Sequence, residues 1–124
     1  MSWLNGTVEE FVRPMGLPAP NFESDRVVKL SFERRGTLFL ERLDDAVRIY
    51  LARRFGRLSL KQLRLALELC SPAERRSLEI HVGLQGDDDL AFLTCIPATD
   101  FIPSTLSKVL EELERLHDRV MQER

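Results

Sequence analysis

The sequence predicts an α+β fold in which a β-sheet packs against helices. Alternating apolar and polar residues, which are typical of strands, occur in two groups separated by a leucine-rich helical stretch. A second pattern, with apolar residues three and four positions apart, fills the end of the chain and predicts a long amphipathic helix. The predicted order is a helix, a three-stranded antiparallel meander, a short helix, a two-stranded hairpin and a long C-terminal helix (α-β-β-β-α-β-β-α).

The first half of the chain contains the predicted meander. A helix is expected over Ser2–Arg13, where apolar residues recur at helical spacing, and the proline-rich stretch 14–20 ends it. Strands are expected over 27–32, 37–43 and 46–52 because apolar residues alternate with polar ones there. The connections between them are too short for a parallel crossover, so the three strands pair antiparallel.

The second half begins with a capped helix. Ser59 and Gln62 have the spacing of a capping box, which predicts a helix over Ser59–Cys70. A second helix-start signal lies at 71–74. Two further segments alternate as strands around an acidic turn, and the long helix follows; these elements are expected at 78–84, 90–96 and 106–121.

Length and charge limit the function classes. A chain of 124 residues suits one domain spanning residues 1–124. A net charge of −2 argues against a nucleic-acid partner, because phosphate binding needs a clustered basic surface. We find no secretory signal and no stretch long and apolar enough to span a membrane. Cys70 and Cys95 form no CxxC pair, so reduced and buried thiols in a cytosolic protein are expected.

The sequence offers little catalytic or metal-binding chemistry. His81 and Glu79 share one face of a predicted strand and form a conceivable general-base pair, but a half-exposed strand histidine is the favoured interpretation. His117 is predicted to be solvated on the polar side of the last helix. The three aspartates at 87–89 lack the frame of a calcium loop and are typical of a solvated turn. We therefore expect no catalytic residue, no metal and no cofactor.

The helix expected at 59–70 carries more apolar surface than one side can use. Leu60, Leu63 and Leu67 form one row, while Leu65 and Leu69 form another, so the helix is apolar nearly all round. Such a helix is buried on several sides, either within its own domain or at an interface. We favour a self-complementary two-fold interface through Leu60, Leu63 and Leu67.

A second apolar surface is expected on the meander. Strands have two faces, and the last helix covers only one of them. The face that carries Phe39 and Tyr50 also carries Arg48 and Glu41, so it is the better candidate for exposure. Together with the first-helix residues Trp3, Leu4 and Phe11, it is predicted to form a groove for a partner.

A local basic strip supports an alternative. Arg48, Arg53, Arg54 and Arg57 lie close together in the sequence, which raises a nucleic-acid-binding or regulatory module as the second hypothesis. Only two aromatic residues, Tyr50 and Phe55, are interleaved with these arginines, whereas an RNA-binding sheet needs several stacking residues on one face. A basic rim is the favoured interpretation.

The order of elements resembles that of class I type III secretion chaperones (the Tir-chaperone family). The likeness covers nearly the whole chain and rests on the architecture. The matching segments are the helix end Phe11–Leu17 (Phe-x-x-x-Met-Gly-Leu, followed by Pro18), the strand Val28–Phe32, the strands Thr37–Leu43 and Ala46–Ala52, the hairpin Leu78–Ile96, and the helix from Leu106.

This resemblance implies a function without catalysis. It implies a homodimer joined through the middle helix and the fourth strand, the latter contributing Ile80 and Val82. It also implies a chaperone of the bacterial cytoplasm that binds the extended N-terminal segment of a secreted effector, with no ATP or metal. The resemblance further implies that the effector would lay apolar side chains on the first helix and the sheet. Whether the chaperone also docks at the export apparatus is left open.

Overall fold

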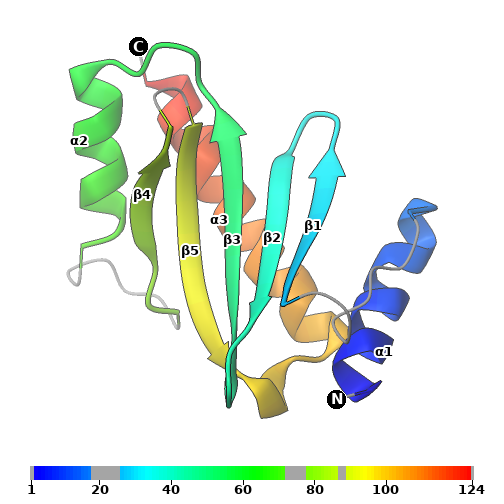
Figure 1. Ribbon diagram of the computed structural model, residues 1–124. Coiled ribbons are helices and arrows are strands. Elements are labelled where there is room, and N and C mark those ends of the chain that lie inside the picture. The colour runs from blue at the N-terminus through cyan, green and yellow to red at the C-terminus, as the bar shows by residue number, and fades with distance from the viewer. Residues whose placement is uncertain (1, 18–25, 72–77, 87–88, 124) are drawn as a thin grey trace.

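The computed structural model describes residues 2–17, 26–71, 78–86 and 89–123, with the side chains of 2 and 3 excepted. Its elements follow the order expected from the sequence, and the α+β fold class is confirmed (Figure 1). The elements are α1 (Ser2–Val12), the 3₁₀ turn η1 (Arg13–Met15), β1 (Val27–Phe32), β2 (Gly36–Arg42), β3 (Ala46–Arg54), α2 (Leu60–Leu69), β4 (His81–Gln85), β5 (Asp89–Pro97), the 3₁₀ turn η2 (Ala98–Asp100) and α3 (Pro103–Gln122).

The five strands form a single antiparallel sheet in the order β1-β2-β3-β5-β4. The meander β1–β3 and the hairpin β4–β5 join because β3 pairs with β5 along nine residues, from Ala46 opposite Pro97 to Arg54 opposite Asp89. This arrangement leaves β1 and β4 as the two edge strands.

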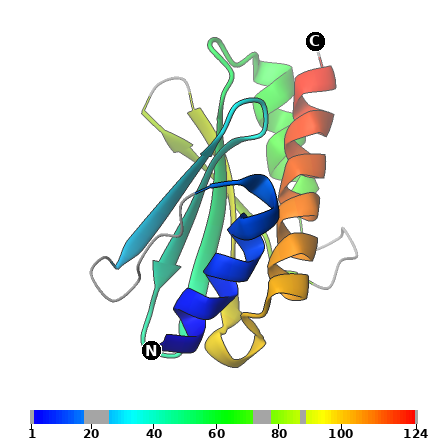
Figure 2. The same ribbon diagram turned by 90° about the vertical axis from the view of Figure 1, so that its right-hand side faces the viewer.

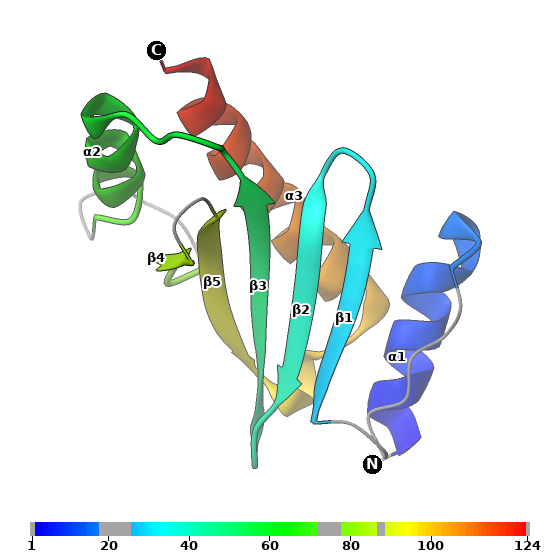
Figure 3. The same ribbon diagram turned by 45° about the horizontal axis from the view of Figure 1, so that its top comes forward.

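Helices cover one face of this sheet. Figure 2 shows α1, α2 and α3 on the same side, with α3 running along the sheet. Figure 3 shows α2 beyond β4 at one edge and α1 beyond β1 at the other, so that α3 lies between them. No helix in the described part of the chain lies on the opposite face, which we call the outer face.

The core lies between α3 and the face of the sheet that the helices cover, which we call the inner face. Alternate residues of each strand point inward, as the burial patterns of β1 to β3 show. The apolar stripe of α3 is buried against this face. Beside it, α1 contributes Leu4, Val8, Phe11 and Val12 to the core. The inward strand residues include Val28, Leu30, Leu38, Leu40, Val47, Ile49, Leu51, Leu90, Phe92 and Ile96. Removal of this apolar surface from water is the main stabilising contribution to the fold.

Most predicted boundaries hold within a few residues. Ser59 caps α2, and the predicted capping box with Gln62 is present on both sides. The fourth strand begins at His81 rather than at 78, so the residues before it, including Ile80, are not part of the ladder. The predicted helix start at 71–74 falls mostly outside the described residues, as does the centre of the acidic turn at 87–88.

Gly36 is the tightest point of the hairpin β1–β2. Its φ of 111° lies in a region that residues with a side chain rarely adopt. A Cβ at this position lies only 2.3 Å from the carbonyl oxygen of Ala52 on β3. The absence of a side chain therefore allows β2 to start directly against β3.

Replacing Gly36 by Ala is expected to lower the free energy of unfolding by at least about 2 kcal/mol, through backbone strain and the clash with Ala52. Chemical denaturation measures this loss. Gly6 of α1 is the matched control, since it has open space around it. Gly6→Ala is expected to stabilise the protein by about 0.5–1 kcal/mol through helix propensity. Equal effects of the two substitutions contradict this account of Gly36.

Candidate functional site

The first candidate surface is an apolar groove between α2 and β4. It has a volume of about 230 Å³, and we call it the α2–β4 groove. Large apolar side chains stand exposed along it or next to it: Leu60 is 72% exposed, Leu67 65% and Leu84 57%. The residues that line the groove are Leu63, Ala66, Leu67, Val82, Gly83, Leu84 and Leu90. Exposed leucines at this density on a small domain are typical of an interaction surface.

The predicted interface residues divide on this surface. Leu63, Leu67 and Val82 line the groove, and Leu60 is exposed on the same helix. Ile80 is buried in the core, so the structure removes it from the predicted surface. Leu84 is an addition that the sequence prediction missed. Its place two residues after Val82 on an edge strand was the available signal.

The second candidate surface crosses the outer face of the sheet. The strand registers place one residue from each strand side by side, a set that we call the outer row. Its members, from β1 to β4, are Lys29, Phe39, Tyr50, Leu93 and His81. The centre of the row is apolar and half-buried, while its two ends are polar and exposed.

Phe39 and Tyr50 stack across β2 and β3. Their ring centroids are 4.7 Å apart and the rings are nearly parallel, at 10°. Burial raises the pKa of the Tyr50 phenol, Glu41 adds to this effect, and Arg48 opposes it. Arg48 donates to Glu41 at 2.8 Å beside the stack, so the charges next to it are balanced. The sequence prediction that these aromatic residues share an accessible face agrees with this geometry.

The predicted groove does not form as a unit. Leu4 and Phe11 are buried in the core, because the apolar stripe of α1 faces α3 and the inner face. They are therefore not surface contacts, and that part of the prediction is wrong for the structure described. The side chain of Trp3 lies outside the described residues. Leu93, which the prediction missed, extends the row next to Tyr50.

The basic strip at 48–57 is divided between the two faces of the sheet. Arg48 and Arg54 belong to the outer face and contact Glu41 and Asp89, at 2.8 Å and 3.6 Å. Arg53 points inward and is buried. Neighbouring strand residues face opposite sides, so these guanidinium groups do not form one patch. This arrangement gives the nucleic-acid hypothesis no continuous phosphate-binding surface.

Arg53 instead joins three elements. Its Nε donates to the carbonyl oxygen of Arg35 in the β1–β2 turn at 3.1 Å. Its Nη1 contacts Asp118 of α3 at 2.8 Å and the sulfur of Met121 at 3.2 Å. A buried guanidinium group with charged and carbonyl partners is a strong structural contact, which explains why this arginine faces inward.

His117 is the clearest error of the sequence prediction. It was expected in solvent, but it is fully buried between α3 and the sheet. Its ring lies 4.8 Å from that of Phe92 in an edge-on arrangement and 5.8 Å from that of Phe55. Nε2 lies 2.7 Å from the carbonyl oxygen of Leu51, so it carries a proton and donates. Nδ1 is then the unprotonated nitrogen, and it has no hydrogen-bond partner among the described residues.

The environment keeps His117 neutral. Burial is the main cause that lowers its pKa to about 4, and the nearby Arg53 acts in the same direction. The hydrogen bond to Leu51 and the carboxylate of Asp118 oppose this shift. A neutral histidine at this depth packs as an aromatic side chain with one hydrogen bond.

The remaining polar groups of the described residues form no catalytic arrangement. The side chain of His81 is exposed on an edge strand, 3.5 Å from an even more exposed Glu79, and it lines none of the described cavities. Cys95 is exposed, against the prediction of a buried thiol, and Cys70 is half-buried; neither forms a disulfide. Within the described ranges, no cluster of potential metal ligands occurs and no helix is long and apolar enough to cross a membrane.

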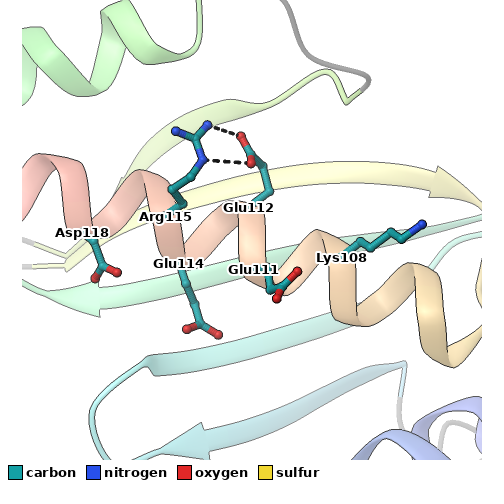
Figure 4. A pocket seen from close by; sticks show the side chains of 6 residues that line it. All are labelled: Lys108, Glu111, Glu112, Glu114, Arg115 and Asp118. Atoms are coloured by element: carbon teal, nitrogen blue, oxygen red, sulfur yellow. Dashed lines mark hydrogen bonds and ion pairs between the residues drawn. The ribbon is translucent and has the colours of Figure 1, made fainter.

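A depression of about 450 Å³ follows the polar side of α3, as Figure 4 shows. All its side chains come from this one helix: Lys108, Glu111, Glu112, Glu114, Arg115 and Asp118. Arg115 binds Glu112 through two contacts, at 2.6 and 3.1 Å. Burial raises the pKa of Glu114, and Arg35 at 3.7 Å opposes the shift. Charges from one helix that pair along its length are typical of a solvated helix face.

The comparison with protein families decides the identity. The model of the family described as type III secretory system chaperone SycN matches residues 3–121. The match extends from α1 into the last turn of α3.

The chain belongs to this family of type III secretion chaperones. The resemblance seen in the sequence is thereby confirmed.

Solved structures show the same fold for this chaperone. A chain of the ExsC–ExsE complex is 18% identical with a TM-score of 0.73, covering 96% of this chain and 89% of that one. A chain of the Yersinia pestis type III secretion chaperone SycH in complex with a YscM2 fragment is 16% identical, with a TM-score of 0.68 and coverages of 98% and 99%. A chain of the heterodimeric ExoU–SpcU complex of Pseudomonas aeruginosa is 16% identical. Its TM-score is 0.67, and the match covers 93% of this chain and 95% of that one. No curated protein matches the chain significantly.

Arg53 and Arg54 provide a matched test of how the basic strip is divided in this chaperone. Arg53→Ala is expected to lower the free energy of unfolding by about 2 kcal/mol, because a buried guanidinium group with three contacts is lost. The side chain of Arg54 is 80% exposed, so Arg54→Ala is expected to cost less than about 1 kcal/mol. Urea denaturation of both variants measures the difference. Similar losses at the two positions refute the assignment of Arg53 to the inner face.

Proposed function

We propose that this chaperone binds the extended N-terminal segment of a type III secreted effector, as a homodimer, and keeps that segment competent for secretion in the bacterial cytoplasm. The observation that carries the proposal is the outer row, which no described helix covers, with the stacked Phe39 and Tyr50 at its centre. Membership in a family of secretion chaperones supports the class of partner. Two related structures, the HopA1–SchA chaperone–effector complex and the type III secretion chaperone SycH with a YscM2 fragment, are consistent with it.

The shape of the outer row suits an extended client. Neighbouring strands lie about 4.8 Å apart, so a row across five strands spans about 19 Å. An extended segment covers this span with about six residues. Half-exposed apolar side chains along such a line suit alternate apolar residues of the client, while the polar ends of the row remain in water.

An edge strand offers a second mode of contact. Among the described strands β1 pairs only with β2, so we infer that the backbone groups on its other side accept an added strand. Val27 is exposed at the start of this strand. We infer that the client crosses the outer row and pairs along β1, because the other edge, β4, adjoins the α2–β4 groove.

The α2–β4 groove is the surface that we assign to the homodimer. A two-fold interface uses the same patch on both subunits, and a leucine helix beside an edge strand can bury its exposed side chains against a second copy. Leu60 and Leu67 are the most exposed large apolar residues described in the chain, and association removes them from water. The proposal assigns no catalytic role to either surface.

Leu67→Asp is expected to convert the dimer to a monomer, because burying an unpaired carboxylate at the interface costs several kcal/mol. Light scattering coupled to size exclusion at micromolar concentration measures the mass. Ile102→Asp is the matched control, since Ile102 is an exposed apolar residue outside both surfaces, and this variant is expected to stay dimeric. A wild-type chain that is monomeric alone contradicts the homodimer, whereas a dimeric Leu67→Asp variant contradicts only its location.

Client binding has a separate test. The tagged chaperone is purified from its native host, the bound chain is identified, and the N-terminal segment of that chain is titrated in a calorimeter. Phe39→Ala and Tyr50→Ala are each expected to weaken the affinity about tenfold, because each removes a central aromatic contact. Ile102→Ala is expected to bind as the wild type. Unchanged affinity in both aromatic variants excludes the outer row as the client site, and a bound chain that is not a secreted protein contradicts the proposed function.

A further inference from the structure

His117 and its surroundings concentrate the polar anchoring of α3 at one end of the helix. In the first half of α3 the buried side chains are apolar: Leu106, Val109, Leu110 and Leu113. In the last turns, adjacent residues make polar contacts with β3, His117 with the Leu51 carbonyl and Asp118 with Arg53. Among the described residues, the end of the helix therefore has two hydrogen-bonded contacts to the sheet that its first half does not show.

Protonation of the second ring nitrogen of His117, Nδ1, costs free energy in the closed structure. Nε2 already donates to Leu51, so a second proton must go to the buried Nδ1, where no described group accepts it. The charged groups that act on the ring are Arg53 of β3, which opposes a positive ring, and Asp118 of α3, which favours one. Its neighbours on β5 and in the β3–α2 connection are the aromatic rings of Phe92 and Phe55, which offer no acceptor.

We propose that His117 is an acid-operated latch. Uptake of a proton at Nδ1 releases the last two turns of α3 from the sheet, together with the contacts that α2 makes on them, while the rest of the fold stays closed. A helix end opens at lower free energy than the whole domain, because it exposes fewer buried residues. Opening the last two turns of α3 exposes three residues that are buried in the closed state: Leu116, His117 and Val120.

The opening extends toward α2 through direct contacts. Nε2 of Gln62 in α2 lies 3.4 Å from the carbonyl oxygen of Val120, and α2 packs against α3. Phe55, which contacts the His117 ring, lies in the connection that leads into α2. Loss of the His117 anchor therefore removes support from the helix that carries Leu60 and Leu67.

The direction of the pH effect follows from linkage. A histidine in the open segment has its ordinary pKa of 6.5, whereas burial lowers the pKa of His117 to about 4 in the closed one. The closed state is therefore fully favoured above about pH 6.5 and loses stability as the pH falls from there toward 4. Near pH 5 the open population is expected to be at least about tenfold larger than near pH 7.5.

Hydrogen exchange tests the latch. Exchange rates, normalised to an unstructured peptide at each pH, are measured near pH 7.5 and pH 5. Protection of residues 114–122 and of α2 is expected to fall about tenfold or more at the lower pH, while β2 and β3 change little. A uniform loss over all elements overturns the proposal, because it indicates global destabilisation instead of a local latch.

The chain contains only two histidines, which gives a matched pair of variants. His117→Gln keeps a donor near the position of Nε2 but does not titrate, so its α3 end is expected to stay protected at both pH values. His81→Gln removes the exposed histidine and is expected to behave as the wild type. An acid response in His117→Gln that equals the wild-type response assigns the effect to carboxylates and refutes the latch.

Wild-type protein provides a test that needs no variant. The two imidazole Cε1 protons are followed by NMR during an acid titration, alongside the amides of α3. The His117 signal is expected to titrate well below pH 6.5, because burial lowers its pKa, and the amides of 114–122 are expected to change with the same midpoint as His117. Independent midpoints for the ring and these amides overturn the proposal even if His117→Gln fails to fold.

Discussion

One sheet with helices on a single face is the constraint on which the rest of this structure depends. A five-stranded sheet has two faces and two edges, and α1, α2 and α3 all lie on the inner side. The outer face then carries whatever side chains alternate with the core residues, here including Phe39, Tyr50 and Leu93. These half-buried apolar side chains are covered by none of the described helices, which is why the outer face is the candidate surface for another chain.

The same constraint separates the two proposed partners. The hairpin β4–β5 joins the meander through β3 and β5, which places β4 at the edge farthest from β1. α2 packs beside α3 at the β4 side, and its row with Leu63 and Leu67 lines the α2–β4 groove together with Val82 and Leu84. A second copy at this edge leaves both β1 and the outer row accessible. One domain of modest size can therefore hold a dimer contact and a client contact without competition between them.

Local alternation predicted the strand faces well, because a period of two depends only on neighbouring residues. It also contained more information than the sequence prediction used. Arg53 has the same parity as Ile49 and Leu51, which places it inward. His117 lies four residues after Leu113 and three before Val120, so it falls on the apolar stripe of α3. In both cases the polar character of the side chain was given more weight than its position.

Other features needed the tertiary structure. The apolar stripe with Leu4 and Phe11 predicted that one face of α1 is buried. Whether that face packs on the core or binds a client depends on where α1 docks. The burial of Ile80 depends on the chain entering the sheet only at His81, after a segment that alternation had extended too far. Likewise, the carbonyl acceptor of His117 comes from a residue 66 positions away. Contacts of this range are set by packing and are absent from local patterns.

Two buried polar groups, His117 of α3 and Arg53 of β3, give the end of this helix a defined position. An apolar stripe against an apolar sheet face is non-directional, and shifts along the helix cost little as long as burial is maintained. Hydrogen bonds from His117 to Leu51 and from Arg53 to Asp118 are satisfied in one alignment only, because a shift leaves a buried donor or charge unpaired. Buried polar groups of this kind add less to stability than apolar packing of the same volume. Their contribution here is to fix α3 over β3, and with it the orientation of α2, whose exposed leucines carry the proposed two-fold contact.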